Sequence, residues 1–253
     1  MQPMGDHPNE IASFEDLLRI TAEQRAHDSP GVDRWLYRGQ LDGSKPLTAS
    51  AGRLPRPRSS PETVDRDLKM FATWRRRAPF YDALLPSNDW EALAVAAHHG
   101  LATRLLDWSL NPLVALFFAV RDDGVVRDDG ALHDDGLDAS DTDGVLWAFQ
   151  VGSVIDPERQ RLGEVDEVAV FFPAGRTHRV IRQRGAFTYH PDPFRPLEEL
   201  AGAQRLARHP VPAGAKRALR GDLDRMGINY EMLFPDLEGF ARHLNWLAQA
   251  QRG

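Results

Sequence analysis

The sequence of 253 residues contains no cysteine, which excludes disulfides, thiolate nucleophiles and zinc sites built on sulfur. It also lacks a long apolar run, because the most apolar stretch, residues 105–120, is interrupted by polar side chains and is shorter than the roughly 18 residues that a membrane span requires. Residues 1–16 show neither the basic start nor the apolar run of an export signal. We therefore expect a cytoplasmic protein without a membrane partner.

Neither sign of charge dominates the chain. It has 31 Lys and Arg against 37 Asp and Glu, for a formal net charge of −6. This balance argues against a protein whose main task is to neutralise a nucleic-acid backbone. Nine Asp and only two Arg lie within residues 121–143, where Asp-Asp-Gly occurs three times. We expect residues 121–144 to be a solvated insertion; a calcium loop is the alternative, but the Glu that usually closes such loops is missing.

Periodicity predicts an α+β fold. Apolar residues spaced by three or four indicate helices, and Ser13, Asp89 and Asn111-Pro112 have the residue types of helix starts. The expected helices are 14–25, 61–78, 90–99, 113–120, 215–226 and 237–250. Short β-branched and aromatic runs indicate strands at 35–38, 102–108, 145–151, 168–172, 179–181 and 186–189. This order predicts a mixed or antiparallel sheet core with helices at both ends of a single domain.

Three polar motifs stand out from this pattern. The first is Tyr37-Arg38-Gly39-Gln40, where an arginine ends an apolar strand. The planar guanidinium of Arg38 suits bidentate recognition of a phosphate or carboxylate, and a structural ion pair is the alternative.

The second motif runs from His98 to Pro112, His-His-Gly-Leu-Ala-Thr-Arg-Leu-Leu-Asp-Trp-Ser-Leu-Asn-Pro. A helix that begins after Asn111 offers free backbone N–H groups to an anion, and Arg104 would add positive charge there. Strand alternation places Thr103 and Asp107 on one face and Arg104 on the other. The alternative is structural: Asp107 caps a turn or pairs with an arginine, and the two histidines complement the end of a helix.

The third motif is Arg182-Gln183-Arg184-Gly185-Ala186-Phe187-Thr188. Gln183 can both donate and accept hydrogen bonds, as recognition of an amide or a ribose hydroxyl requires.

Together these motifs and Leu233-Phe234-Pro235-Asp236-Leu237 resemble the FRG domain family, from about Trp35 to Trp246, with Tyr37 in place of the phenylalanine of the family's Phe-Arg-Gly triplet. A fainter resemblance is to ADP-ribosyltransferases of the Arg-Ser-Glu kind, whose arginine binds the NAD phosphates, whose serine orients the ribose and whose glutamate fixes the ribose and the nucleophile. This resemblance implies a transferase-like fold with Arg38 and Ser109 in the first two roles. Glu167 matches the glutamate best by position, with Glu164 and Gln183 as alternatives. Gln183 cannot ionise, so its use would favour ligand binding or a different carboxylate such as Asp107.

The resemblance implies an NAD-utilising transferase or glycohydrolase acting as a toxin or in defence, with NAD as substrate, a macromolecular acceptor of ADP-ribose and no metal. The candidate catalytic residues are Arg38, Asp107, Ser109, Glu167 and Gln183; the candidate ligand-binding residues are Arg38, Gln40, His98, His99, Thr103, Arg104 and Asn111. A nucleotide- or protein-binding module without turnover is the first alternative. Metal-assisted phosphodiester hydrolysis by His98, His99 and Asp107 is the second, although adjacent helical histidines point about 100° apart.

Overall fold

A computed structural model describes residues 9–26, 35–55, 65–121, 142–174, 182–200 and 205–250. The chain forms two compact units. Unit 1 comprises Met1–Lys45, Ser109–Phe149 and Ala207–Gly253, and unit 2 comprises Pro46–Trp108 and Gln150–Leu206. Each unit has its own helices and three strands, so the α+β class predicted from the sequence is confirmed.

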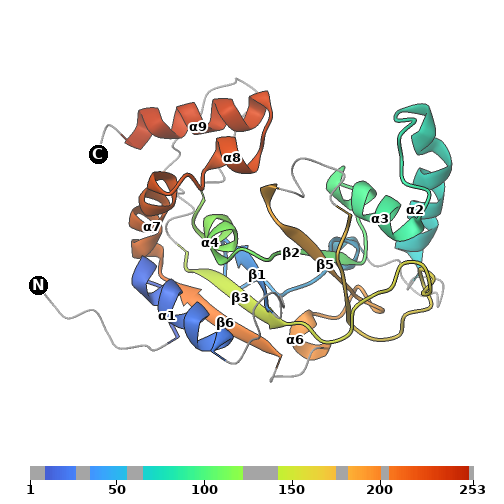
Figure 1. Cartoon of the computed structure of the whole chain (residues 1–253), viewed down its shortest axis with the longest axis horizontal. Coiled ribbons are helices and arrows are strands. Elements are labelled where there is room, and N and C mark those ends of the chain that lie inside the picture. Colours follow the sequence, from blue (N-terminus) through green and yellow to red (C-terminus); the bar gives the residue numbers. More distant parts are fainter. Residues whose placement is uncertain are drawn as a thin grey trace, which may run out of the picture. The chain divides into compact units, whose positions relative to one another are not determined.

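Unit 1 packs helices on a short sheet in which the strand order is β1-β3-β6. Its elements are α1 (Phe14–Arg25), β1 (Trp35–Gln40), α4 (Pro112–Val120), β3 (Gly144–Gln150), β6 (Leu206–Val211), α7 (Ala213–Arg225), α8 (Tyr230–Leu233) and α9 (Leu237–Ala250). Helix α4 is apolar on every side and lies against β1 (Figure 1). Its buried side chains share one apolar core with residues of α1, β3 and α7, which explains why so short a helix needs no polar face.

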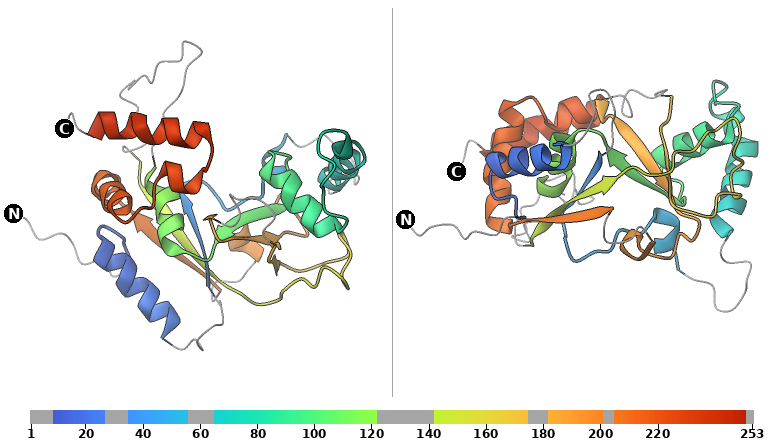
Figure 2. Two further views of the ribbon diagram at one scale, coloured as in Figure 1. Left: turned by 45° about the horizontal axis from the view of Figure 1, so that its top comes forward. Right: turned by 60° about the horizontal axis from the view of Figure 1, so that its bottom comes forward.

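Unit 2 contains the strands β2, β4 and β5, in the order β4-β5-β2. Its elements are the 3-10 turn η1 (Ser50–Arg53), α2 (Arg66–Arg77), the 3-10 turn η3 (Ala78–Phe80), α3 (Asp89–His98), β2 (Leu105–Ser109, whose last residue belongs to unit 1), β4 (Ala169–Phe171), β5 (Gly185–Tyr189) and α6 (Leu197–Leu200). Strands β4 and β5 are antiparallel, with Ala169 opposite Tyr189. Helices α2 and α3 lie side by side in both views of Figure 2.

The core of unit 2 is centred on Trp90 of α3. Its ring lies 5.8 Å from that of Phe171 and 5.1 Å from that of Tyr189, and its Nε1 donates to the Gln160 carbonyl at 2.7 Å. Because the indole N–H is satisfied by backbone, this large side chain is buried without leaving a polar group unpaired. Helix α3 is thereby fixed on the sheet.

Most of the expected elements are found, with local corrections; the short helices α6 and α8 were not predicted. Ser13 forms the predicted N-cap, and Asn111 with Pro112 opens α4 as expected. The cap of α3 is Asn88 rather than Asp89, because the Asn88 side chain accepts from the Trp90 and Glu91 amides. Strand β6 was not predicted, since its sequence contains Arg, His and Pro.

Three sequence-based expectations lie wholly or mainly outside the described residues. These are the strand at 179–181, the start of the helix expected at 61–78, and almost all of the insertion at 121–144. In the described part of the chain, no helix is both long enough and apolar enough to cross a bilayer.

Gly39 allows the contact between β1 and α4. A Cβ atom at Gly39 would lie 1.9 Å from the Ala115 carbonyl oxygen, so Gly39→Ala must push strand and helix apart. We expect the free energy of unfolding to fall by at least about 1–3 kcal/mol, the usual cost of overpacking. The measurement is urea unfolding followed by circular dichroism.

Gly214→Ala is the matched control, because a Cβ at this position in α7 would meet no atom within 4 Å. It should leave stability unchanged or raise it by up to about 1 kcal/mol. Equal stability of the Gly39→Ala variant and the wild type would contradict the proposed packing.

His209 makes unit 1 sensitive to acid. The ring is buried between Gln24, whose Nε2 lies 3.1 Å from Nε2 of His209, and the Asn9 carbonyl, 3.2 Å from Nδ1. Burial lowers the pKa of His209 below its ordinary value of 6.5. The unfolded chain therefore binds a proton that the folded chain does not, and stability should fall as the pH drops below about 6.5.

We expect this loss between about pH 7.5 and pH 5.5 to be smaller in His209→Gln, when urea midpoints of variant and wild type are compared at both pH values. His99→Gln, which changes an exposed histidine, should keep the wild-type dependence. An unchanged pH dependence in His209→Gln would refute this role of His209.

Candidate ligand-binding site

The first motif divides between the two faces of β1. Tyr37 is fully buried and Gly39 contacts α4, so these two residues face the apolar core. Alternation along the strand places Arg38 and Gln40 on the opposite face. Both side chains are half-buried there.

Gln40 lies on that second face in a fixed position. Its Oε1 accepts a hydrogen bond of 2.7 Å from Nε1 of Trp147 on β3. The guanidinium of Arg208 on β6 lies 5.9 Å from the centre of a Trp147 ring. This arrangement explains why a glutamine follows the Arg-Gly pair, and the phosphate-binding role of Arg38 stays a prediction.

Ser109 and Asn111 satisfy backbone groups at the start of α4. Ser109 Oγ accepts from the Asn111 amide at 3.0 Å, and Asn111 Oδ1 accepts from the Leu113 amide at 3.0 Å. Ser109 lies opposite Tyr37 in antiparallel register, so its side chain shares the face of Tyr37 and not that of Arg38. The expectation that Arg38 and Ser109 act in one cleft therefore lacks support from the strand register.

Arg104 lies in unit 2 in a buried network and not at an open phosphate site. Its guanidinium makes a bidentate pair with Asp67 of α2, with distances of 2.8 Å from Nε and 2.7 Å from Nη2. It also donates to Asp65, to the Tyr189 hydroxyl and to the Pro191 carbonyl. Arg104 is 2% exposed and Asp67 4% exposed, so this charge serves an internal ion pair.

The surroundings of Arg104 and Tyr189 shift the pKa values of both groups. Burial by itself lowers the pKa of Arg104, but the hydrogen bonds and charge of Asp67 outweigh burial and raise it above the ordinary value. Burial raises the pKa of Tyr189, against the opposing effect of Arg104. At neutral pH, Arg104 is therefore charged and the Tyr189 hydroxyl is protonated.

The second and third motifs meet inside unit 2. Nε1 of Trp108 donates to Thr188 Oγ1 at 2.9 Å, and Thr188 Oγ1 lies 3.0 Å from Nε2 of His190. All three side chains are buried, and sequence reasoning had not connected them. Thr103 is buried as well, and its backbone exchanges hydrogen bonds with the Ser50 hydroxyl. These residues are part of the framework of the unit.

The candidate carboxylates are at the surface of unit 2. Glu167 and Asp107 are exposed, and Glu167 Oε1 accepts a bond of 2.5 Å from Ser153 Oγ. Glu164 is also exposed, and Gln183 is half-buried. Which of these groups fills the third transferase position stays a prediction.

The histidine pair ends α3. The rings of His98 and His99 are 5.4 Å apart and nearly perpendicular, and Gly100 follows with a left-handed φ of 85°. In the described ranges, no three His, Asp or Glu side chains are grouped to hold a metal ion. The metal-dependent alternative built on His98, His99 and Asp107 therefore gains no geometric support.

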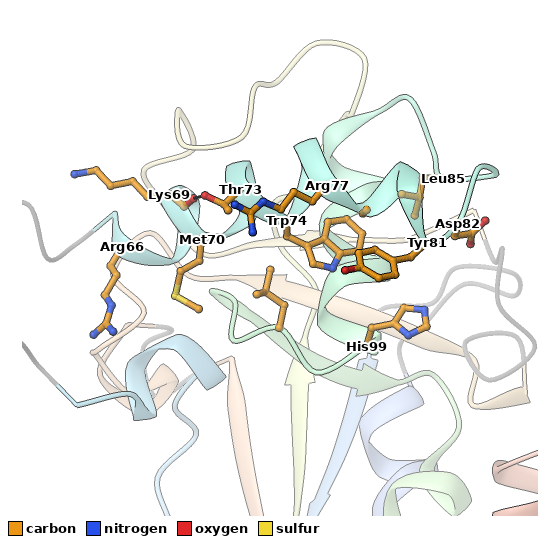
Figure 3. A pocket seen from close by; sticks show the side chains of 12 residues that line it. Arg66, Lys69, Met70, Thr73, Trp74, Arg77, Tyr81, Asp82, Leu85 and His99 are labelled. Carbon is orange, nitrogen blue, oxygen red and sulfur yellow. Dashed lines mark hydrogen bonds between the residues drawn. The ribbon is translucent and has the colours of Figure 1, made fainter.

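A cavity of about 770 Å³ lies within unit 2 beside α2. Helix α2 supplies one wall, the segment after η3 supplies the far end, and the residues that follow α3 close the remaining side (Figure 3). The lining residues are Arg66, Lys69, Met70, Thr73, Trp74, Arg77, Ala78, Tyr81, Asp82, Leu85, His99 and Leu101. Of the residues predicted for the site, His99 is the one that lines this cavity.

The lining combines aromatic and other apolar side chains with positively charged ones. Trp74 and Tyr81 present aromatic rings, and Arg66, Lys69 and Arg77 outnumber the one carboxylate, Asp82. Figure 3 shows Arg66 and Lys69 towards one end and Trp74, Tyr81 and His99 towards the other. Sequence reasoning missed this wall because arginines at 75–77 also suit the negative end of a helix, a position that indicates no ligand. The signal was the spacing of residues 66, 69, 70, 73, 74 and 77, which share one helical face.

The ion pair of Arg104 with Asp67 joins this wall to the residue that precedes β2. Asp67→Asn would remove the buried carboxylate that pairs with the Arg104 guanidinium, and we expect a loss of about 3–5 kcal/mol in the free energy of unfolding. Guanidinium unfolding monitored by tryptophan fluorescence measures the loss.

Asp89→Asn is the control for this prediction, because Asp89 pairs with Arg75 at 3.2 Å on the surface. Exposed pairs contribute about 0–1 kcal/mol. Similar losses of unfolding free energy in the two variants would contradict the larger contribution expected of the buried pair.

Comparison with known proteins gives one match. The model of the FRG domain matches residues 33–126, whereas neither the curated proteins nor the solved structures yield a match. The matched segment contains the first two motifs and every residue that lines the cavity, and it ends before the third motif. Residues 33–126 are an FRG domain.

Proposed function

We propose that this protein binds a nucleotide in the cavity beside α2. The observation that carries the proposal is the combination of Trp74 and Tyr81 with three cationic side chains around a single cavity of about 770 Å³. Small-molecule sites usually have volumes of about 300–1,000 Å³ and an apolar lining with a few polar groups. A phosphorylated nucleoside offers both a flat ring for the aromatic side chains and negative charge for the cations.

The chemistry of the lining favours this ligand class over neutral or cationic ones. Stacking on Trp74 or Tyr81 supplies apolar contact to a base, and Arg77 or Arg66 can bind phosphate oxygens through the two N–H groups of its fork. Arg66 already donates one N–H to the Pro55 carbonyl at 3.3 Å, but a guanidinium has five such donors. Asp82 accepts from the Leu84 amide at 2.8 Å, which reduces its repulsion of an anion.

The cavity also has a rigid wall. Asp65 and Asp67, at the start of α2, are bound by Arg104 of unit 2, so the helix that carries half of the lining is fixed before a ligand arrives. Sites whose supporting residues are locked by packing and hydrogen bonds bind with a smaller ordering cost.

Isothermal titration calorimetry with ATP, ADP-ribose and NAD tests the proposal. We expect heat of binding for at least one of these nucleotides and a roughly tenfold or greater loss of affinity in Arg77→Ala, the size expected when one charge-assisted hydrogen bond is removed. Arg76→Ala is the matched control, since it removes the same charge from the next residue, which does not line the cavity. Equal losses in both variants, or no binding of any nucleotide, would overturn the proposal.

NAD chemistry is a further proposal that the transferase resemblance implies. Arg38 lies in β1, and Ser109 is engaged at the start of α4, where its Oγ accepts from the Asn111 amide. Geometry therefore favours binding over turnover. Mass spectrometry for free nicotinamide after incubation with NAD decides between them: release that Arg38→Ala and Glu167→Gln abolish would establish an enzyme.

A further inference from the structure

The cavity continues into an exposed aromatic surface. Phe80 and Tyr81 are 86% and 83% exposed, and their rings meet edge to face at 5.1 Å. Tyr81 lines the cavity, whereas Phe80 lies outside it. A single nucleotide has one base, and the cavity walls can accommodate that base. The exposed ring of Phe80 beside the cavity would then have no ligand group to contact.

The cations of α2 are also spread too widely for one phosphate group. Arg66 and Arg77 are eleven positions apart on the helix, which at 1.5 Å per residue separates their Cα atoms by about 16 Å. Lys69 lies between them on the same face. A row of positive charge of this length matches a ligand with repeated phosphates.

The positive row contrasts with the rest of the chain. The whole sequence has a formal net charge of −6, yet the cavity lining has three Lys or Arg against one Asp. Arg76 and Arg77 at the end of α2 have no ion-pair partner among the residues that the structure describes. Charge is therefore concentrated where the aromatic side chains are exposed, and the charge balance of the whole sequence conceals this segregation.

We propose that the surface formed by Arg66, Lys69, Trp74, Arg77, Phe80 and Tyr81 binds single-stranded nucleic acid, with one base in the cavity and a neighbouring base on Phe80. Cations that follow the backbone and aromatic rings that stack on bases are the general means of binding single strands without sequence preference. The bases of a duplex are stacked on one another and do not offer their faces to Phe80. The inference rests on the proposed nucleotide site and extends it to a polymer.

Fluorescence anisotropy with labelled single strands of roughly 12 nucleotides, oligo-U and oligo-dT, tests this inference. We expect binding of at least one strand, with a slope of log affinity against log salt near −2, as about three neutralised phosphates predict at roughly 0.7 each. Preference for oligo-U would identify RNA as the ligand, and equal binding would show that the 2′-hydroxyl is not recognised. A double-stranded oligonucleotide of the same length should bind more weakly.

The Phe80→Ala variant distinguishes binding of a strand from binding of a single nucleotide. Loss of one stacked base should weaken strand binding about tenfold and leave the affinity for ATP or NAD unchanged, because Phe80 does not line the cavity. Leu84→Ala is the matched control, since Leu84 is 85% exposed in the same segment but has no ring. It should leave strand binding unchanged.

Three results would overturn the inference. Binding of nucleotides without binding of either strand would leave the proposed function intact and would exclude single-stranded nucleic acid as a ligand. Equal weakening of strand binding by Phe80→Ala and Leu84→Ala would show that stacking of a base on the Phe80 ring makes no contribution of its own. Tighter binding of the duplex than of the single strands would show that charge alone attracts nucleic acid to this face.

Discussion

The buried ion pair between Arg104 and Asp67 is the interaction on which the proposed site depends. It joins the residue before β2 to the first turn of α2 across 37 positions of sequence, and Tyr189 and Pro191 accept from the same guanidinium. Breaking such a pair is costly because the remaining charge stays in an apolar interior. Arg104 therefore holds the start of the helix that supplies half of the cavity lining, although it does not itself line the cavity. Arg104 is a positioning residue in this account.

The conspicuous motifs of the chain build its framework more than its ligand site. Gly39 permits close packing of α4 on β1, Ser109 and Asn111 satisfy the backbone where α4 begins, and Trp108 of the second motif bonds to Thr188 of the third. Each of these roles demands a particular residue type at a fixed place. The cavity, in contrast, is lined mainly by exposed or half-buried side chains of α2 and of the segment after it, which are less conspicuous in the sequence.

Sequence reasoning succeeded where structure is determined locally. Ser13 and Asn111 were predicted as caps because a cap is a bond between near neighbours, and α4 was recognised because an apolar helix must be buried. Strand β6 was missed because Arg208, His209 and Pro210 do not indicate a strand. Its extended conformation is stabilised by pairing with β3, which the local sequence does not show. Arg104 was assigned to a phosphate because nothing local indicates Asp67 as its partner, and the cavity was missed because it forms only when α2 lies beside the residues after α3.

Hydrogen exchange of the backbone amides of α2, in the wild type and in Arg104→Lys, is the most direct test of the account. Lysine keeps the positive charge but cannot reproduce the bidentate bond to Asp67. The account predicts faster exchange in residues 66–77 of the variant, with the amides of α4 in unit 1 protected as in the wild type. Unchanged protection of α2 would contradict it, because the wall of the cavity would then be held by other contacts.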